Sequence, residues 1–218
     1  YIVTVDIGTS STKTALWDET GMLVAETSSA YPLHRPDPLW AEIDADIWWR
    51  ASCATIQNVL DASEIDPEDV VGVGVDAVGW TLLPVDRALN PLFPAMIWLD
   101  RRAAVETQSL QDAANAQQLV DLVANPIDAA YITPKLMWLK NHHPDVFDAA
   151  HQFLNATAFI TGRLTGTATC DYTQAYGYHF VDIANECWDQ SAAQHVGDAL
   201  ENMPRLCPCT EVVGTVTA

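Results

Sequence analysis

The chain has 218 residues, which is enough for one large domain or two small ones with an ample core. Its 29 acidic and 10 basic side chains give a formal charge of −19, and 49% of its residues are hydrophobic. This charge argues against electrostatic binding to nucleic acid or to an anionic membrane, and no apolar run approaches the length of a membrane span. We therefore expect a globular protein that binds neither nucleic acid nor membranes.

The cysteines favour a reducing compartment. The five of them are odd in number and lack the paired spacing of metal ligands, so we interpret them as reduced thiols. Two of them flank a proline in Cys207-Pro208-Cys209, which allows a redox role but is more typical of a loop. Because no signal peptide is visible, the sequence predicts a cytoplasmic protein.

The chain opens with YIVTVDIGTSSTKTALWD, which predicts two strands joined by a polar turn. Alternating apolar and β-branched residues from Tyr1 to Val5 indicate a buried strand, and we expect Asp6 to end it. Gly8 allows a tight reversal because it has no Cβ. The turn is then lined with hydroxyls and backbone N–H groups, which come from Thr9, Ser10, Ser11 and Thr12.

The turn has the composition of an anion site. Its donors can surround a phosphate, Asp6 beside it can hold a hydrated Mg²⁺, and Lys13 adds a mobile positive charge. An ordinary β-hairpin with a polar loop explains the same residues equally well, because such turns are common. The turn is not a Walker loop, since G-x-x-x-x-G-K-[ST] is absent and a strand, not a helix, follows.

After this hairpin the pattern predicts a third strand, an irregular loop and a long helix. Met22–Ser28 continues the meander, and three prolines forbid regular structure between Tyr31 and Ile43. Asp44 is expected to cap a helix that runs to about Ala62. Two further strands are predicted over Val70–Asp76 and Trp80–Val85.

The rest of the chain is mainly helical by its periodicity. Helices are predicted over about Asp100–Ala114, Ala116–Ala124, Pro134–His142 and Ala156–Gly162. Beyond Gly166 the pattern weakens to short segments. Because neither an internal repeat nor a low-complexity linker interrupts it, we expect one α/β domain over residues 1–218.

The hairpin resembles the phosphate-binding motif D-x-G-T-[ST]-[ST]-x-[KR] of the sugar-kinase, heat-shock-protein and actin superfamily, and within it the FGGY carbohydrate kinases. Later segments are similar to that family in the same order: Tyr31-Pro32 through Trp40-Ala41-Glu42, Trp48-Trp49, Ala95–Arg102, Pro134–Leu139 and Asn155–Leu164. The resemblance implies a ribonuclease-H-like (actin/hsp70/sugar-kinase superfamily) α/β fold, with flanking helices on a mixed sheet. It also implies the amino-terminal, sugar-binding lobe of a xylulose- or ribulose-kinase-like enzyme.

The resemblance further implies phosphorylation of a sugar hydroxyl with ATP and Mg²⁺ as cofactors. Asp6 would lie beside the transferring phosphate and hold the metal through water. The nucleotide phosphates would contact Thr9, Ser10, Ser11 and Lys13. This assignment agrees with phosphoryl-transfer chemistry, which depends on positioning and charge neutralisation more than on covalent catalysis. The net negative charge opposes ATP binding unless Mg²⁺ and local donors compensate.

In this family the sugar site lies partly in the loop that here reads VDAVGWT, from Val75 to Thr81. Val78 stands where xylulose kinases carry histidine in G-Q-M-H-G and glycerol kinases carry arginine in N-Q-R-E-T. Asp76 could accept sugar hydroxyls and Trp80 could offer an aromatic face. A turn-forming aspartate and a core tryptophan are the alternatives.

Three further positions bear on the sugar. Asp100 and Arg102 follow a strand end, where α/β sheets place ligands, although a helix cap with a surface ion pair is equally compatible with them. Ala130, with Tyr131 next to it, replaces the tyrosine that glycerol kinases carry five residues before the lysine of the next motif. A ketopentose such as xylulose is the expected substrate, but neither the sugar nor the oligomeric state is fixed, and a homodimer is compatible with the sequence.

One catalytic part of the family is absent from the chain. The general base is an aspartate in a G-x-x-D segment, and no such segment occurs before Ala218. We therefore expect a carbohydrate kinase whose carboxy-terminal nucleotide-binding lobe lies outside this chain, so that the isolated chain is inactive. The alternatives are a non-catalytic sugar-binding module and an acidic structural domain without a ligand. Asp6 and Lys13 argue against the module, because a protein that only senses a sugar does not need them.

Two other patterns carry less weight. Gly72 to Ala77 fits the dinucleotide pattern G-x-G-x-x-A, but the residues that follow are strand-like and cannot open the helix that such a site requires. The histidines show no zinc spacing. A dehydrogenase and a zinc protein are both disfavoured.

Overall fold

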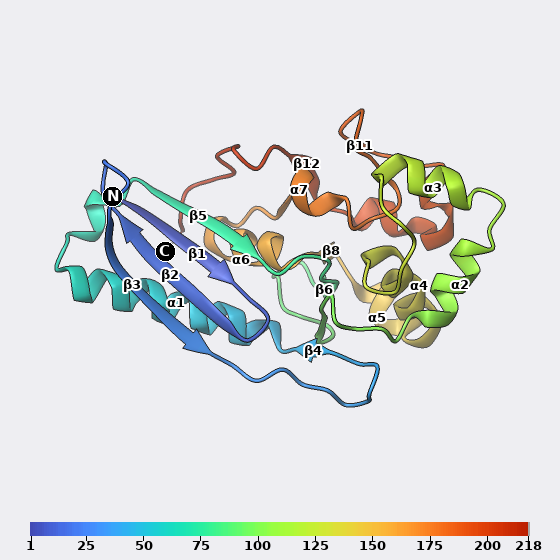
Figure 1. Ribbon diagram of the computed structural model, residues 1–218, viewed down its shortest axis with the longest axis horizontal. Helices are drawn as coiled ribbons and strands as arrows, with labels where there is room; N and C mark the ends of the chain where they lie inside the picture. Colours follow the sequence, from blue (N-terminus) through green and yellow to red (C-terminus); the bar gives the residue numbers. More distant parts are fainter. Residues whose placement is uncertain (218) are drawn as a thin grey trace.

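The computed structural model describes residues 1–217, apart from the side chains of residues 197 and 198. The chain begins with an antiparallel meander, and β5 then joins parallel to β1, so that the strand order is β3-β2-β1-β5 (Figure 1). The predicted α/β class with a mixed sheet is confirmed. The four strands are β1 (Ile2–Ile7), β2 (Ser11–Trp17), β3 (Leu23–Ala30) and β5 (Gly72–Ala77).

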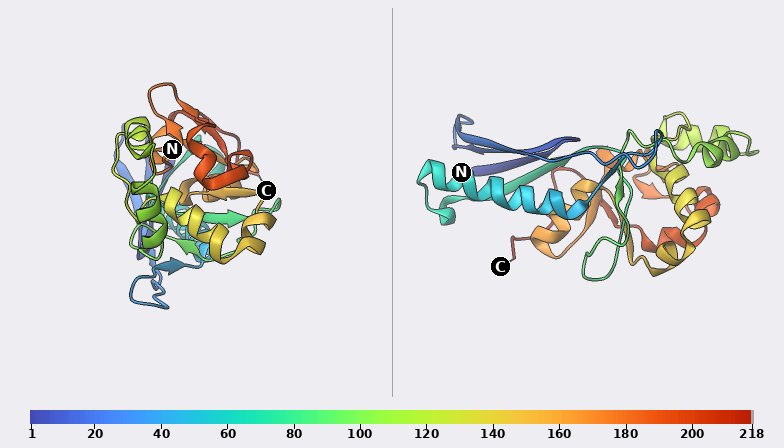
Figure 2. Two further views of the ribbon diagram at one scale, coloured as in Figure 1. Left: turned by 90° about the vertical axis from the view of Figure 1, so that its right-hand side faces the viewer. Right: turned by 90° about the horizontal axis from the view of Figure 1, so that it is seen from below.

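The sheet has one covered face and one open face, because apolar and polar residues alternate along its strands. Val3, Val5 and Ile7 are at most 1% exposed and belong to one core with helix α1 (Ala45–Ser63) and helix α6 (Ala156–Thr165). Each such side chain contributes roughly 1.5–3 kcal/mol on burial. Figure 2 shows α1 lying along one face of the sheet, which leaves the other face free for polar side chains.

The predicted long helix is confirmed as α1, with Asp44 as its cap. The Asp44 carboxylate accepts a hydrogen bond from the Asp46 N–H over 3.0 Å. The predicted strand from Trp80 is wrong over its first residues, because Trp80 has a left-handed φ of 54° and the strand begins only at Leu83. This strand is part of the small pairs outside the main sheet, formed by β4 (Glu42–Ile43) with β7 (Ala95–Met96) and by β6 (Leu83–Val85) with β8 (Gln152–Leu154).

The second half of the chain is helical and then irregular, as predicted. The helix predicted from Asp100 starts only at Ala104, and the helix from Ala156 continues past Gly162 to Gly166, which ends it with a φ of 74°. The remaining helices are η1 (Pro67–Asp69), α2 (Ala104–Gln111), α3 (Ala116–Val123), α4 (Ile132–His142), α5 (Pro144–Ala149), α7 (Tyr172–Ala175) and η2 (Ala192–Asn202). The remaining strands are β9 (Thr169–Asp171), β10 (Val181–Asp182), β11 (Cys187–Trp188) and β12 (Arg205–Cys207).

The molecule contains two hydrophobic cores. One lies between the sheet, α1 and α6, and the other is built from α2 to α5 together with residues after 170. Figure 1 shows the two halves side by side, the sheet at the left and the helices at the right. Within residues 1–217, no helix combines the length and the apolar character that crossing a bilayer requires.

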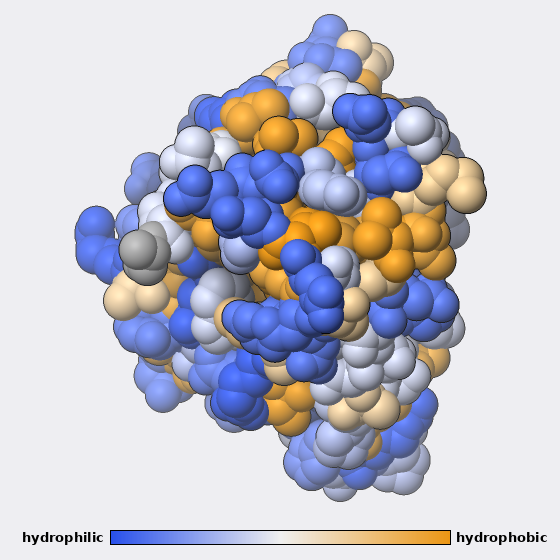
Figure 3. Space-filling view, turned by 90° about the vertical axis from the view of Figure 1, so that its left-hand side faces the viewer, coloured by the Kyte–Doolittle hydropathy of each residue, from blue (hydrophilic) through white to orange (hydrophobic). Residues whose placement is uncertain are grey.

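The end of the sheet where the chain begins exposes apolar side chains. Figure 3 shows them among hydrophilic neighbours. The exposed apolar residues from this end are Tyr1, Ile2, Met22, Leu23, Val24 and Val71. They lie at the opposite end of β1 from Asp6 and Ile7, so this surface is separate from the predicted site.

Candidate functional site

The turn between β1 and β2 is tighter than the sequence indicates. β1 continues through Asp6, so the prediction that Asp6 ends the strand is wrong; pairing with β2 on one side and β5 on the other keeps this residue extended. Only Gly8, Thr9 and Ser10 form the turn. The Gly8 N–H donates to the Ser11 carbonyl over 2.9 Å, and a Cβ on Gly8 would lie 3.1 Å from the same oxygen.

A row of polar side chains crosses the open face of the sheet at this turn. Asp6 is paired with Lys13 on β2 and with Asp76 on β5, and Lys13 is paired in turn with Ser28 on β3. Directly opposed residues point to the same face with Cβ atoms about 4.5–5.5 Å apart. The structure thus brings the predicted residues Asp6, Lys13 and Asp76 together, and all three are exposed.

Neither carboxylate of the row is engaged by a basic side chain. Among the described side chains, no lysine, arginine or histidine forms an ion pair with Asp6 or Asp76. Asp76 accepts a hydrogen bond from the Ala77 N–H over 2.9 Å. Two neighbouring carboxylates that lack a cation, beside an ammonium group, suit a hydrated metal ion and a phosphate.

The hydroxyls of the predicted turn divide into two groups. Thr9 and Ser10 lie at the tip, where no acceptor for their backbone N–H groups is found among the described residues, and Ser11 starts β2. Thr12 is fully buried, with its hydroxyl 3.3 Å from the Tyr31 hydroxyl, so its predicted place in the turn lining is wrong. Thr12 alternates inward because it continues the strand.

Tyr31 is a part of the turn that the sequence analysis missed. Its hydroxyl donates to the Gly8 carbonyl over 2.8 Å, and its backbone N–H donates to the Ser10 carbonyl over 3.0 Å. Burial raises the pKa of the Tyr31 phenol, so the hydroxyl keeps its proton and remains a donor. Tyr31 therefore fixes the turn from the side of the proline loop.

The loop after β5 places the predicted sugar residues beside the turn. The Val78 N–H donates to the Ile7 carbonyl over 2.7 Å, which joins this loop to the end of β1. The Trp80 ring lies against Tyr131 with a centroid separation of 4.6 Å, and against Tyr176 at 6.0 Å. The loop thus runs from Asp76 in the polar row, through Val78, to Trp80, which packs in an aromatic cluster with Tyr131 and Tyr176.

Trp98 is a second residue that the sequence analysis did not select. Its indole N–H donates to the Thr9 hydroxyl oxygen over 3.2 Å, and its side chain is partly exposed. The W-x-D segment was visible in the sequence, but its reach to the turn, 89 residues away, was not. Trp98 therefore links the loop after β7 to the phosphate-type turn.

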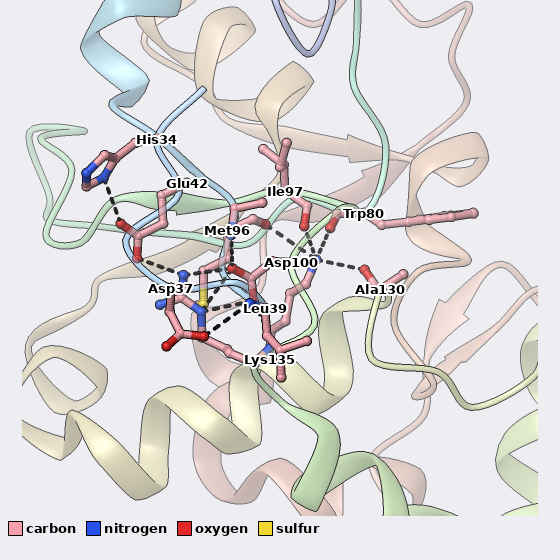
Figure 4. A network of polar contacts seen from close by, with 12 residues as sticks. His34, Asp37, Leu39, Glu42, Trp80, Met96, Ile97, Asp100, Ala130 and Lys135 are labelled. Carbon is pink, nitrogen blue, oxygen red and sulfur yellow. Dashed lines mark hydrogen bonds and ion pairs between the residues drawn. The ribbon is translucent and has the colours of Figure 1, made fainter. Parts of the chain in front are cut away.

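Asp100 and Arg102 lie apart from this surface. Their side chains have no exposed area and pair over 2.7 Å, and the Arg102 guanidinium also donates to Glu42 over 2.7 Å. Figure 4 labels the two carboxylates of this network, those of Asp100 and Glu42. The guanidinium stacks on Trp40, 3.9 Å from the ring centroid. Buried in this way, neither side chain can touch a sugar in this structure; the substrate role stays a prediction, and the geometry indicates a structural ion pair.

The described residues contain no group of three or more side chains that could enclose a metal ion. Magnesium, however, usually keeps several waters and is held by one or two carboxylates together with phosphate oxygens. Asp6, with Asp76 in register beside it, provides that kind of donor set. The residues present therefore fit a hydrated Mg²⁺ that arrives with a nucleotide.

Comparison with known proteins gives a consistent match. The chain matches the N-terminal domain of the FGGY family of carbohydrate kinases over residues 1–218. It is 30% identical over 210 residues to the xylulose kinase of Klebsiella pneumoniae, with 96% of this chain and 43% of the relative covered. It is 29% identical over 225 residues to the glycerol kinase of Acidovorax ebreus (strain TPSY), with coverages of 100% and 45%.

The solved structures agree with the sequence comparison. The ligand-bound xylulose kinase from Lactobacillus acidophilus superposes with a TM-score of 0.93 at 27% identity, over 100% of this chain and 44% of that protein. The chain thus spans less than half the length of the relatives it matches.

Proposed function

Since the chain belongs to the FGGY family of carbohydrate kinases, we propose that the protein transfers a phosphoryl group from ATP to a hydroxyl of a ketopentose such as xylulose. Membership confirms the resemblance that the motifs indicated. The observation that carries the proposal is the row of Asp76, Asp6 and Lys13 beside the turn at residues 8–10. The choice of sugar is supported by the names of relatives, which include xylulose kinases as well as a glycerol kinase.

We infer that residues 1–218 form the sugar-binding lobe of a larger enzyme. The match to an N-terminal domain and the coverage of less than half of the relatives support this assignment. The general base and the nucleotide-binding lobe would then lie outside these residues. On this proposal the isolated chain binds sugar but does not turn over ATP.

The turn and the polar row divide the work of binding the phosphates. The backbone N–H groups of Thr9 and Ser10 and the ammonium of Lys13 bind and orient phosphate oxygens, and the hydroxyl of Ser11 adds a further donor. Asp6 would hold Mg²⁺ through water, and the ion would neutralise charge on the phosphates. Because phosphoryl transfer depends mainly on alignment and electrostatics, rigid pairing of Asp6 and Lys13 in the sheet favours catalysis.

In the proposed reaction, the loop after β5 orients the sugar. Asp76 accepts hydrogen bonds from sugar hydroxyls, and Trp80 supplies an apolar face beside Tyr131. Val78 occupies the position of a polar residue in the related kinases, so fewer hydrogen bonds reach the sugar from this loop. Closure of a second lobe over this surface would exclude water and limit wasteful hydrolysis of ATP.

The proposal is tested by ADP release from the complete protein with xylulose, ribulose, glycerol and gluconate in turn. We expect one ketopentose to stimulate ADP release at least tenfold over the rate without sugar. Strong stimulation by glycerol or gluconate alone would correct the substrate but keep the reaction. Sugar binding without any stimulated ADP release would contradict the kinase proposal and favour a sugar-binding module.

A further inference from the structure

Lys135 is fully buried in the first turn of α4, where a lysine is unusual. Its ammonium donates to three backbone carbonyls, those of Trp80 over 2.8 Å, Ile97 over 2.7 Å and Ala130 over 2.7 Å, and a fourth oxygen, that of Met96, lies at 3.5 Å (Figure 4). An ammonium has three N–H donors and no acceptor, so three short bonds to carbonyls satisfy it completely.

The three carbonyls come from three separate segments. Trp80 lies in the loop after β5, Ile97 follows β7, and Ala130 precedes α4. The first two segments meet at one isolated bridge, in which the Leu82 and Met96 backbones exchange two hydrogen bonds of 3.0 Å, and no strand pairing joins the segment before α4 to either of them. Each carbonyl belongs to an aromatic residue of the site or to the residue directly before one, since Trp98 follows Ile97 and Tyr131 follows Ala130. Lys135 thus holds the backbone at all three aromatic residues.

These three aromatic residues face the predicted site from the sugar side. Trp80 packs on Tyr131, and Trp98 donates to Thr9 in the turn between β1 and β2. Trp80 also adopts a left-handed φ of 54°, which a residue with a large side chain adopts only when its surroundings hold it there. The bond from Lys135 to the Trp80 carbonyl is one such restraint.

Lys135 does not form an ion pair. No carboxylate lies within ion-pair distance among the described side chains, and Asp100, the closest acidic influence on it, is already paired with Arg102. Burial lowers the pKa of Lys135 to about 7, and the negative charge of Asp100 opposes this shift. Because the short hydrogen bonds of Lys135 go only to backbone carbonyls, its structural effect is to fix the relative positions of those carbonyls.

We propose that Lys135 is a positioning residue for the sugar: its ammonium sets the loops of Trp80, Trp98 and Tyr131 against the phosphate-binding turn. The inference rests on the proposed kinase function. On this inference, Lys135 increases the affinity for the sugar without touching the sugar itself. The phosphate side is held mainly by sheet pairing, and it depends on Lys135 only through the bond from Trp98 to Thr9.

The test compares KM values for sugar and for ATP in the complete protein. We expect Lys135→Met to raise the KM for the sugar at least tenfold and the KM for ATP by no more than threefold, which is the effect expected from loss of the bond between Trp98 and Thr9. Lys140→Met is the matched control, because Lys140 lies on the same helix but is exposed, and both KM values should stay unchanged. A folded Lys135→Met protein with an unchanged sugar KM, or with equal rises in both KM values, would overturn the inference.

A second variant covers the case in which Lys135→Met does not fold. Lys135→Ala is refolded with propylammonium, which replaces the missing end of the side chain, or with tetramethylammonium, which has the charge but no N–H donor. We expect only propylammonium to restore sugar affinity. Equal sugar affinity with either cation would overturn the inference.

The same measurements separate the two proposals. If no sugar stimulates ADP release by the unaltered protein, the kinase function fails and the positioning role fails with it. If the unaltered protein is stimulated and the Lys135 variants keep its sugar KM, only the positioning role fails.

Discussion

The two sides of the candidate site are held by different interactions. On the phosphate side, strand pairing fixes Asp6 between Lys13 and Asp76, and backbone hydrogen bonds close the turn. On the proposed sugar side, the segments after β5 and β7 share only the bridge between Leu82 and Met96. The Lys135 ammonium ties both of them to the segment before α4, and Arg102 ties the loop after β7 to Glu42 on β4. A regular sheet thus presents the proposed phosphate-binding groups, whereas two buried cations join the loops of the proposed sugar side.

This difference has a consequence for how substitutions act. Exposed polar residues on the sheet can be changed without loss of structure, because the backbone pairing remains. A buried cation cannot be removed without leaving carbonyls or carboxylates in the interior unpaired. We therefore expect loss of activity without loss of stability on the phosphate side, and coupled losses on the sugar side.

The largest effect is expected for Asp6→Asn. The change keeps the shape of an exposed side chain but removes its charge, so kcat should fall roughly 100- to 1,000-fold while the free energy of unfolding changes by less than about 0.5 kcal/mol. Steady-state ADP release and urea unfolding measure the two quantities. Glu26→Gln is the matched control, since Glu26 is exposed on the same face in the next row. A kcat within threefold of the original would remove Asp6 from the mechanism.

The next effect is on stability, for Arg102→Met. The substitution leaves Asp100 and Glu42 buried without their cation, which should lower the free energy of unfolding by about 3–5 kcal/mol. Arg50→Met removes only an exposed pair with Asp44 and should cost less than about 1 kcal/mol. Urea unfolding of both variants gives the comparison. Similar decreases in the free energy of unfolding for the two variants would show that the buried ion pairs stabilise the fold no more than the exposed pair does.

The pH dependence of stability isolates Lys135. Its pKa is about 7 in the folded protein and 10.5 when unperturbed, so between these values the unfolded chain binds more protons. The Lys135 contribution to stability therefore rises with pH across this window, by at most about 1.4 kcal/mol per pH unit, and is constant below it. Lys135→Met should lack this rise. Urea unfolding from pH 7 to 10 tests it, and parallel pH profiles for the two proteins would contradict the assignment.

The smallest effect is expected where the two sides meet, for Trp98→Phe. This change removes only the bond from the indole N–H to the Thr9 hydroxyl, at a partly exposed position, and such bonds contribute about 0.5–1.5 kcal/mol. We expect the KM for ATP to rise about two- to threefold. A rise above tenfold in ATP titrations would mean that the turn depends on the loop after β7 and that the two sides are not independent.

The same division explains what could be predicted from the sequence. Alternation predicted β1 to β3, and the Asp44 cap with helical periodicity predicted α1, because these signals are local. The parallel pairing that places Asp76 beside Asp6 depends on contacts 70 residues apart. The resemblance implied a mixed sheet but not this pairing. Strand β1 continues through Asp6 because this residue is paired with β2 on one side and with β5 on the other. No local sequence signal indicated this extension.

The sugar side was harder to predict because its key groups violate local expectations. A lysine in a helix normally lies at the surface, so nothing in the sequence marked Lys135 as a buried ligand of three carbonyls. Asp100 and Arg102 belong to a recognisable sequence motif, but the motif did not indicate that both side chains are buried. On the phosphate side, the sequence did not indicate Tyr31, because its contacts with Gly8 and Ser10 join residues more than 20 positions apart.

The most direct measurement of the central claim is the yield of sugar phosphate per ADP released by the complete protein, followed by phosphorus NMR with xylulose as the acceptor. The account predicts one phosphorylated sugar for each ADP, and loss of both products together in Asp6→Asn. Release of ADP together with inorganic phosphate but without sugar phosphate, or an Asp6→Asn protein that still phosphorylates xylulose at the original rate, would contradict it.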